Sequence, residues 1–284
     1  MKKFILFSLL LLAALTSGAQ VLVTSLEADS AFAAIDRQEW DRADSLLVLA
    51  INTRPNDPAN VLLLSNLGMI RHYRGLDSLA LATLDHARNI SPRSTVILAN
   101  RATVLTALGR TDEALRDYNT LLSLDPSQPR PRYQRALLLL RKGLTDEARA
   151  DATALDTIAP DSQERHTLRA AMLSAEGAFE EAIPHYTEVI KLCPQPEFYS
   201  ARALCYLMTD NLPEAAEDIS QGLALDPTDP ELYLYRAALN KMRYRPDDAE
   251  ADARRAIAYG MDPRRAAPFL STDQKTSSSS SRNK

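Results

Sequence analysis

The sequence has 284 residues, of which 45% are hydrophobic, and this content is sufficient to bury a large core. Its formal net charge is -4 at pH 7, and no basic run is interleaved with aromatic residues, so we expect no nucleic-acid partner. The chain has eight glycines, six phenylalanines and one tryptophan against abundant alanine and leucine. This composition favours helices over sheets.

The first nineteen residues have the pattern of a secretory signal peptide. Lys2 and Lys3 precede an apolar run at residues 4–15, and residues 16–19 are small, which indicates cleavage after Ala19. The apolar run is shorter than the ~20 residues that a membrane span needs. We therefore expect an exported chain, periplasmic or secreted, with no stable membrane span after cleavage. An uncleaved anchor is the alternative.

A segment at residues 109–126 recurs 34 residues later at 143–160, and again at 177–194. A small residue follows the same period, at intervals of 37, 34, 34, 34, 33 and 34 residues: Ala43, Ala80, Ala114, Ala148, Ala182, Ala215 and Ala249. A proline that stops the helix recurs in step with it: Pro55, Pro92, Pro126, Pro160, Pro194 and Pro227. Two markers that keep the same period indicate an internal repeat.

This pattern resembles the tetratricopeptide repeat, a 34-residue helix–turn–helix unit. A second series of small residues matches the first helix of that repeat: Gly68, Ala102, Ala136, Ala170, Ala203 and Ala237. Tyr118 and Tyr186 match its aromatic position. The resemblance covers seven units, at approximately residues 24–57, 61–94, 95–128, 129–162, 163–195, 196–229 and 230–263. It implies an all-α fold, a right-handed α-solenoid of stacked repeats over residues 20–270.

Helical stripes support the same architecture on physical grounds. In the third unit Ala99, Ala102 and Leu105 lie on one helical face, and Ala114, Tyr118 and Leu121 lie on another. Neither helix can bury its stripe alone, so each pair must stack on its neighbours. After the last unit, residues 266–270 are expected to cover the final helix pair with Phe269, and residues 271–284 are a serine-rich tail predicted to be disordered.

An arginine occupies the seventh place of five consecutive units: Arg101, Arg135, Arg169, Arg202 and Arg236. Four of them are followed sixteen residues later by an aspartate: Asp117, Asp151, Asp218 and Asp252. In the remaining unit His185 holds that place. We interpret the series as a structural ladder of charge-assisted hydrogen bonds between helices. A row of arginines facing a groove and binding anionic ligands is the alternative.

The resemblance further implies that side chains of the first helices line a concave binding surface. The candidate partner-binding residues are Asn66, His72, Tyr73, Asn100, Arg130, Tyr133, Gln134 and Arg141. Aromatic and arginine side chains dominate protein interfaces, which favours Arg130, Tyr133 and Arg141. We therefore predict a non-enzymatic protein–protein interaction scaffold or adaptor of the bacterial cell envelope that binds a protein or peptide. The alternative is a module that binds envelope glycan or peptidoglycan, and self-association through the terminal unit stays open.

Catalytic motifs are absent from the sequence, which has no GxxxxGK[ST], GxSxG or HExxH pattern. We expect the four histidines to lie in separate units: His72, His86, His166 and His185. A pair that binds one metal would need a second histidine three or four residues away, and none has one. No catalytic residue, metal site or cofactor is therefore predicted.

Overall fold

The structure is a computed structural model that describes residues 26–55 and 57–271. The predicted signal peptide at residues 1–19 lies outside the described residues, as does all but the first residue of the predicted tail. The described part of the chain is built from helices and contains no strand. It forms two compact units, one up to Leu138 and one from Leu139, and the division falls within α7 (Pro129–Arg141).

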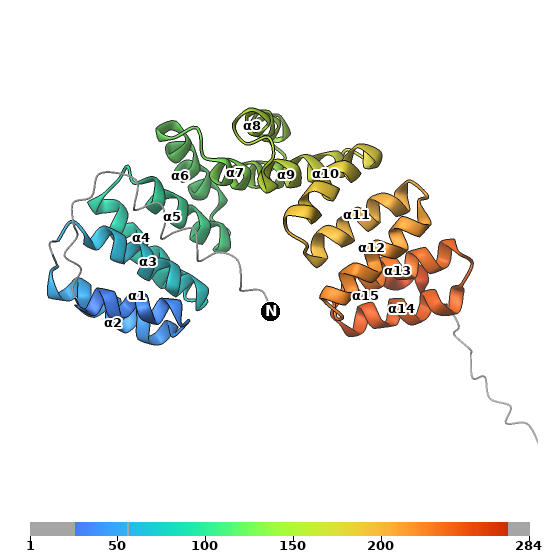
Figure 1. Cartoon of the computed structure of the whole chain (residues 1–284), viewed down its shortest axis with the longest axis horizontal. Coiled ribbons are helices and arrows are strands. Elements are labelled where there is room, and N and C mark those ends of the chain that lie inside the picture. Colours follow the sequence, from blue (N-terminus) through green and yellow to red (C-terminus); the bar gives the residue numbers. More distant parts are fainter. Residues whose placement is uncertain (1–25, 56, 272–284) are drawn as a thin grey trace, which may run out of the picture. The chain divides into compact units, whose positions relative to one another are not determined.

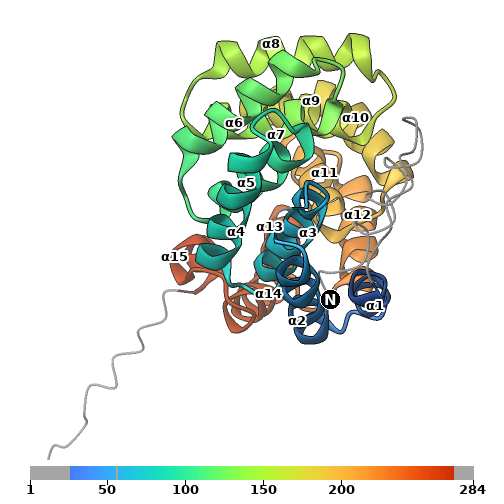
Figure 2. The same cartoon turned by 90° about the vertical axis from the view of Figure 1, so that its left-hand side faces the viewer.

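The first unit consists of helical hairpins in chain order. Its helices before α7 are α1 (Leu26–Asp36), α2 (Trp40–Thr53), α3 (Asn60–Tyr73), α4 (Asp77–Ile90), α5 (Thr95–Ala107) and α6 (Thr111–Leu124). Within this unit α1 packs on α2, α3 on α4, and α5 on α6, and each hairpin also contacts the next (Figures 1 and 2). First helices of successive hairpins also touch, since α3 packs on α5.

The second unit continues the same order. Its helices are α8 (Thr145–Ile158), α9 (Gln163–Ala175), α10 (Phe179–Leu192), α11 (Pro196–Met208), α12 (Leu212–Leu225), α13 (Pro230–Met242) and α14 (Pro246–Ala258), followed by α15 (Pro263–Ala266) and the 3-10 helix η1 (Ala267–Phe269). The hairpins α9–α10, α11–α12 and α13–α14 stack one on the next (Figure 1). The all-α fold of stacked helix–turn–helix units predicted from the period is confirmed.

Side-chain caps fix where several first helices begin. Ser94 accepts a hydrogen bond from the Ile97 amide at the start of α5, and Asp229 accepts from two amides at the start of α13. Such caps satisfy backbone donors that the first turn of a helix leaves unpaired. Second helices instead carry acids in their first turn, where the positive end of the helix dipole stabilises them, as Asp112 and Glu113 do in α6.

The periodic alanines form the contacts between helices. All seven alanines of the series that opens the second helices are buried, with exposed fractions between 0% and 2%. In the second hairpin, Gly68 is the small residue of the first helix. A Cβ added there would lie 2.6 Å from Leu84 Cγ on the second helix. The small side chains therefore allow the close helix approach that the period predicted.

The turn inside each of the seven described hairpins contains a residue with positive φ. Glycine holds this place four times: Gly75, Gly109, Gly143 and Gly177. In the other three hairpins the place belongs to Gln38, Asp210 and Tyr244, with φ of 60°, 59° and 59°. The left-handed conformation closes the C-terminal end of the first helix, and only glycine adopts it without a steric cost.

The C-terminal end of the second unit is covered as the sequence predicted. Phe269 and Leu270 pack against a buried cluster that includes Leu234, Ala253 and Ala266. The apolar surface of the last hairpin is thereby shielded by α15 and η1. Among the described residues, no helix combines the length and the hydropathy that crossing a membrane requires.

Candidate functional site

Most of the predicted partner-binding residues lie on first helices of the first unit. Asn66, His72 and Tyr73 belong to α3, Asn100 to α5, and the exposed Arg130 with Tyr133 and Gln134 to α7. Arg141 is the last residue of α7 and belongs to the second unit. The candidate surface that can be built from the described contacts is therefore the first-helix face of the first unit, formed by α3, α5 and the start of α7.

Two of these polar side chains hold the first-helix face together. Asn100 Nδ2 donates to Ser65 Oγ at 2.9 Å and so ties α5 to α3. His72 Nδ1 lies 2.6 Å from Asp77 Oδ1 and joins the end of α3 to the start of α4. Asn100 and His72 therefore contribute to the rigidity of the surface as well as to its polar character.

Aromatic side chains meet at the C-terminal end of α3. The ring of Tyr73 lies 6.3 Å from that of Trp40 and 5.8 Å from that of His72, centroid to centroid. Burial raises the pKa of Tyr73 above its ordinary value, and the positive charge of Arg130 opposes this rise. Tyr73 therefore stays a neutral phenol whose electrostatic neighbour is a cation from α7.

The charge of Arg130 also affects the pKa of a second tyrosine, Tyr118. Burial raises the pKa of Tyr118, while a hydrogen bond with Thr103 and the charge of Arg130 oppose the rise. Arg130 itself is exposed in the first turn of α7. The first-helix face of the first unit thus presents an accessible guanidinium whose field reaches two phenols, an arrangement suited to an anionic or hydrogen-bond-accepting group of a ligand.

The predicted ladder forms between the helices of three repeats. Arg202 donates to both carboxylate oxygens of Asp218, from Nε at 2.8 Å and from Nη2 at 2.6 Å. Arg236 contacts Asp252 in the same bidentate way, and Arg101 Nη1 donates to Asp117 Oδ2 at 2.5 Å. The guanidinium groups of these repeats are therefore engaged by buried carboxylates.

The arginines also donate hydrogen bonds to the preceding repeat, a contact that the spacing within one repeat does not predict. Arg101 Nε donates to Asp85 Oδ1 on α4, and Arg202 Nη1 donates to Thr187 Oγ1 on α10. Arg135 Nη1 donates to Asn119 Oδ1 on α6 in the same manner. These acceptors precede their arginine by fifteen or sixteen residues, so an arginine can bridge three successive helices.

The remaining two arginines of the series differ. Arg135 and Asp151 belong to different units, and Asp151 is 1% exposed. Arg169 donates to Asp156 at the end of α8, with Nη2 as the closer nitrogen, rather than to α10. Position 185, the place of the ladder aspartate in α10, is a histidine.

The expectation that the four histidines lie in separate repeats is wrong, since His72 and His86 share the unit at residues 61–94 and the other two share a second unit. His166 and His185 both belong to the unit at residues 163–195, and their Nδ1 atoms lie 3.1 Å apart. They come from α9 and α10, nineteen residues apart, so a search at helical spacing of three or four residues could not find them. The described residues contain no cluster of three or more side chains suited to hold a metal ion.

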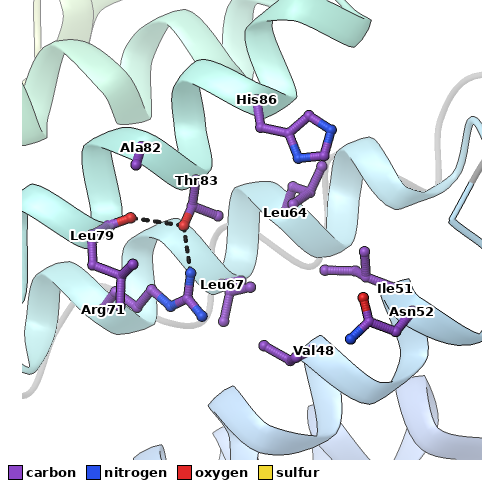
Figure 3. Close-up of a pocket in the computed structure, with 10 residues that line it drawn as sticks. All are labelled: Val48, Ile51, Asn52, Leu64, Leu67, Arg71, Leu79, Ala82, Thr83 and His86. Carbon is purple, nitrogen blue, oxygen red and sulfur yellow. Dashed lines mark hydrogen bonds between the residues drawn. The ribbon is translucent and has the colours of Figure 1, made fainter.

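A hollow of about 280 Å³ lies between α2, α3 and α4 (Figure 3). It is lined by Val48, Ile51 and Asn52 of α2, Leu64, Leu67 and Arg71 of α3, and Leu79, Ala82, Thr83 and His86 of α4. Arg71 is fixed in its wall, since Nη1 donates to Thr83 Oγ1 at 2.6 Å and Nε to Asp44 Oδ2 at 3.1 Å. The hollow is mainly apolar and can accept an apolar side chain. It occurs where the repeat interval is 37 rather than 34 residues.

The sequence contained partial signals for the residues that were missed. Trp40 is the chain's single tryptophan, at the start of a second helix, and Tyr118 occupies the aromatic repeat position. The longer first interval marked the repeat junction at which the hollow forms. None of these signals specified which side chains would meet, because that depends on the rotation of each helix about its axis.

Comparison with known proteins identifies the repeat. Residues 102–143 match a family described as TPR repeat, and residues 173–230 match one described as tetratricopeptide repeat. The crystal structure of a tetratricopeptide repeat protein from Parabacteroides merdae is similar to this chain with a TM-score of 0.68 and 26% identity, over 86% of this chain and 96% of that one.

Two further similarities concern larger proteins. The structure of the APC/C hetero-tetramer Cut9–Hcn1 has a TM-score of 0.68 at 13% identity and covers 86% of this chain and 54% of its own, so it shows the fold alone. The U-box domain-containing protein 70 of Oryza sativa subsp. japonica is 44% identical over 54 residues. That match spans 19% of this chain and 7% of the rice protein.

Proposed function

We propose that this chain, which carries tetratricopeptide repeats, is a non-enzymatic scaffold of the bacterial cell envelope that binds a protein segment on its first-helix face. Stacked tetratricopeptide repeats support protein–protein interaction as the general function. The observation that carries the finer proposal is Arg130, an exposed cation on α7 whose charge influences both Tyr73 and Tyr118. Arginine and tyrosine are the side chains most often found at the energetic centre of a protein interface.

The chemistry of the face favours an extended or helical peptide with an acidic or carbonyl-rich stretch. Arg130 can donate to a carboxylate, and the hydroxyl of the half-buried Tyr73 can donate a hydrogen bond. Tyr118 is buried and bonds to Thr103, so it supports the face from within. Asn100 and His72 are already bonded within the face, so it changes little in shape on binding. We therefore expect this chain to lose little conformational entropy when it binds its partner.

Site-specific photocrosslinking in intact cells tests the binding face. A photoreactive amino acid is placed at Asn66 or Arg130, and at Arg116 on α6 as the control, whose side chain is 69% exposed. We expect the same protein to be crosslinked from Asn66 and Arg130 and not from Arg116. Arg130→Glu should abolish capture from Asn66. Equal crosslinking from Arg116, or crosslinking from Asn66 that is unchanged by Arg130→Glu, would mean that the partner does not bind on the first-helix face.

The envelope location is proposed from the N-terminal sequence. Two lysines, an apolar run and small residues precede Gln20, the order of a secretory signal. Cell fractionation with N-terminal sequencing of the recovered protein is the test, and we expect a chain that begins at Gln20 in the envelope or secreted fraction. A full-length chain in the cytosol would refute the location without affecting the binding face.

A glycan ligand is the second candidate, and the pair of rings formed by Trp40 and Tyr73 favours it. Aromatic rings combine an apolar face with a polar edge, and such rings can stack on sugars. Retention on purified cell wall that is lost in Trp40→Ala, together with no protein crosslink from Asn66, would support this candidate over the first.

A further inference from the structure

The hairpin α9–α10 lacks the connection that joins its neighbour α11–α12. In α11–α12, Arg202 and Asp218 form a bidentate ion pair. In α9–α10 the corresponding arginine, Arg169, donates to Asp156 of α8, and the corresponding carboxylate is replaced by His185. Helix α10 therefore has no ladder carboxylate with which to hold α9.

A hydrogen bond between two imidazole rings takes the place of that ion pair. His166 Nδ1 and His185 Nδ1 lie 3.1 Å apart, with ring centroids 5.3 Å apart and planes inclined by 50°. His166 is buried, with 9% of its surface exposed, and His185 is half-buried. Such a bond requires one protonated and one unprotonated Nδ1, so two imidazolium ions cannot form it.

The charges around the pair make protonation unfavourable. Arg165 Nη1 lies 3.5 Å from His166 Nδ1 and 3.4 Å from its Nε2, and Arg169 on the same helix adds a second positive charge. The carboxylates near the pair are Asp156 of α8, Asp161 of the following loop and Glu188 of α10. Asp156 already accepts from both arginines. On the α11 side, Arg202 is bonded to Thr187 and Asp218.

We infer that the α9–α10 hairpin is an acid-sensitive joint, in which uptake of protons by His166 and His185 breaks their mutual hydrogen bond and loosens α10 from α9. The inference concerns the second unit alone and does not depend on the proposed partner. Its consequence is that the repeat at residues 163–195 opens at mildly acidic pH while the hairpin α11–α12, which has an arginine–aspartate pair, stays closed.

The direction of the effect follows from the two pKa values. Burial first, and then the charge of Arg165, lowers the pKa of His166, and the same causes lower that of His185, with contributions from His166 and Arg169. The unfolded reference is about 6.5. Because the pKa values are lower in the folded state, the unfolded chain binds more protons than the folded chain once pH falls below that reference. A fall in pH therefore favours unfolding. The stabilisation is therefore complete above pH ~6.5 and is lost as pH falls toward the folded pKa values.

Hydrogen exchange with mass spectrometry tests the joint in the full chain. Protection of α10 is compared with that of α12 at about pH 7.5 and about pH 5.5, each corrected for the intrinsic exchange rate. We expect α10 to lose protection by up to about tenfold per pH unit for each proton taken up, and α12 to change little. Equal loss in both helices, or no loss in α10, would overturn the inference.

The variant His185→Asp separates this mechanism from general acid sensitivity. It places a carboxylate sixteen residues after Arg169, which would then lie between two aspartates as Arg101 lies between Asp85 and Asp117. We expect α10 in this variant to keep its protection at the lower pH. If it does not fold, His166→Gln removes one titrating ring but retains a hydrogen-bonding amide, and should reduce the pH response of α10. A response identical to wild type in either folded variant contradicts the inference.

Discussion

Arg202 and Asp218, sixteen residues apart, form a bidentate ion pair in which two guanidinium nitrogens donate to the two carboxylate oxygens at 2.8 and 2.6 Å. Asp218 is only 2% exposed. Burial opposes the charge of Arg202, but the hydrogen bond and the charge of Asp218 outweigh it, so the pKa of Arg202 lies above its ordinary value. The pair joins α11 to α12, and Arg202 extends it to Thr187 of α10.

Asp218→Ala is expected to lower the free energy of unfolding by about 3 kcal/mol, because it leaves a partly buried guanidinium without its carboxylate. Denaturant unfolding followed by circular dichroism measures the change. The matched control is Glu217→Ala, since Glu217 is exposed and bonds only to Gln221 among the contacts described; it should change stability by less than about 0.5 kcal/mol. Similar losses in the two variants would contradict a stabilising role for the ladder.

Replacing both partners should be milder than removing one. In Arg202→Leu with Asp218→Leu neither charge remains buried, so we expect most of the loss seen in Asp218→Ala to be recovered. The same denaturation experiment gives the coupling between the two positions. If the double variant loses as much free energy of unfolding as the two single variants together, the carboxylate acts independently of Arg202.

Three turns carry a non-glycine residue with positive φ where the other hairpins have glycine: Gln38, Asp210 and Tyr244. Tyr244, with φ of 59°, is 94% exposed, so its side chain contributes almost no packing that a substitution would remove. Tyr244→Gly should therefore raise the free energy of unfolding by about 0.5–1 kcal/mol, through relief of the left-handed conformation. Asp210→Gly is expected to act in the same direction.

The reciprocal control is Gly177→Ala. A Cβ at this glycine would meet no atom within 4 Å, so only its φ of 79° can matter. We expect a loss of about 1 kcal/mol. Thermal unfolding under identical conditions measures all three variants, and a Tyr244→Gly protein no more stable than wild type would refute the strain argument.

Gly68 lies at a close contact between α3 and α4. A Cβ at this position would lie 2.6 Å from Leu84 Cγ and 2.9 Å from Leu84 Cδ2. Gly68→Ala should therefore lower the free energy of unfolding by about 1–3 kcal/mol, because Leu84 is buried and cannot turn away freely. Adding Leu84→Val relieves the contact, so the double variant should lose less than the sum of the two single losses.

The features of this fold that can be predicted from the sequence are those set by spacing along the chain. The alanines and prolines specify an interval, and an interval is enough to predict hairpins, their order and the buried face of each second helix. Phe269 was predicted to cover the last hairpin because its apolar side chain follows the final repeat directly, and the cluster around Leu234 confirms this. Such features depend on local spacing alone.

The missed contacts depend on relations between helices. The bond from Arg101 to Asp85 joins successive repeats, whereas the predicted partner Asp117 lies in the same hairpin. His166 and His185 meet because two helices bring positions nineteen residues apart onto facing sides. The hollow between α2 and α4 depends on how the longer first interval changes helix packing, which no single residue encodes.

Tyr235 makes stability depend on pH at the alkaline end. Burial, with the charge of Glu231, raises the pKa of this phenol to about 12, and Arg265 opposes the rise. Because the unfolded phenol ionises near pH 10, the unfolded state loses its proton first as pH rises. The stabilisation is therefore complete below pH ~10 and is lost as pH rises toward about 12.

Denaturant unfolding at a series of pH values between about 9 and 11.5 measures this dependence. Tyr235→Phe keeps the half-buried ring but removes the titrating hydroxyl, so we expect stability in this variant to fall less steeply over that range than in wild type. The control Tyr244→Phe removes a hydroxyl from a side chain that is 94% exposed and should leave the slope unchanged. Parallel slopes for wild type and Tyr235→Phe would mean that Tyr235 ionises equally in the folded and unfolded states, so that its burial against Glu231 has no electrostatic consequence.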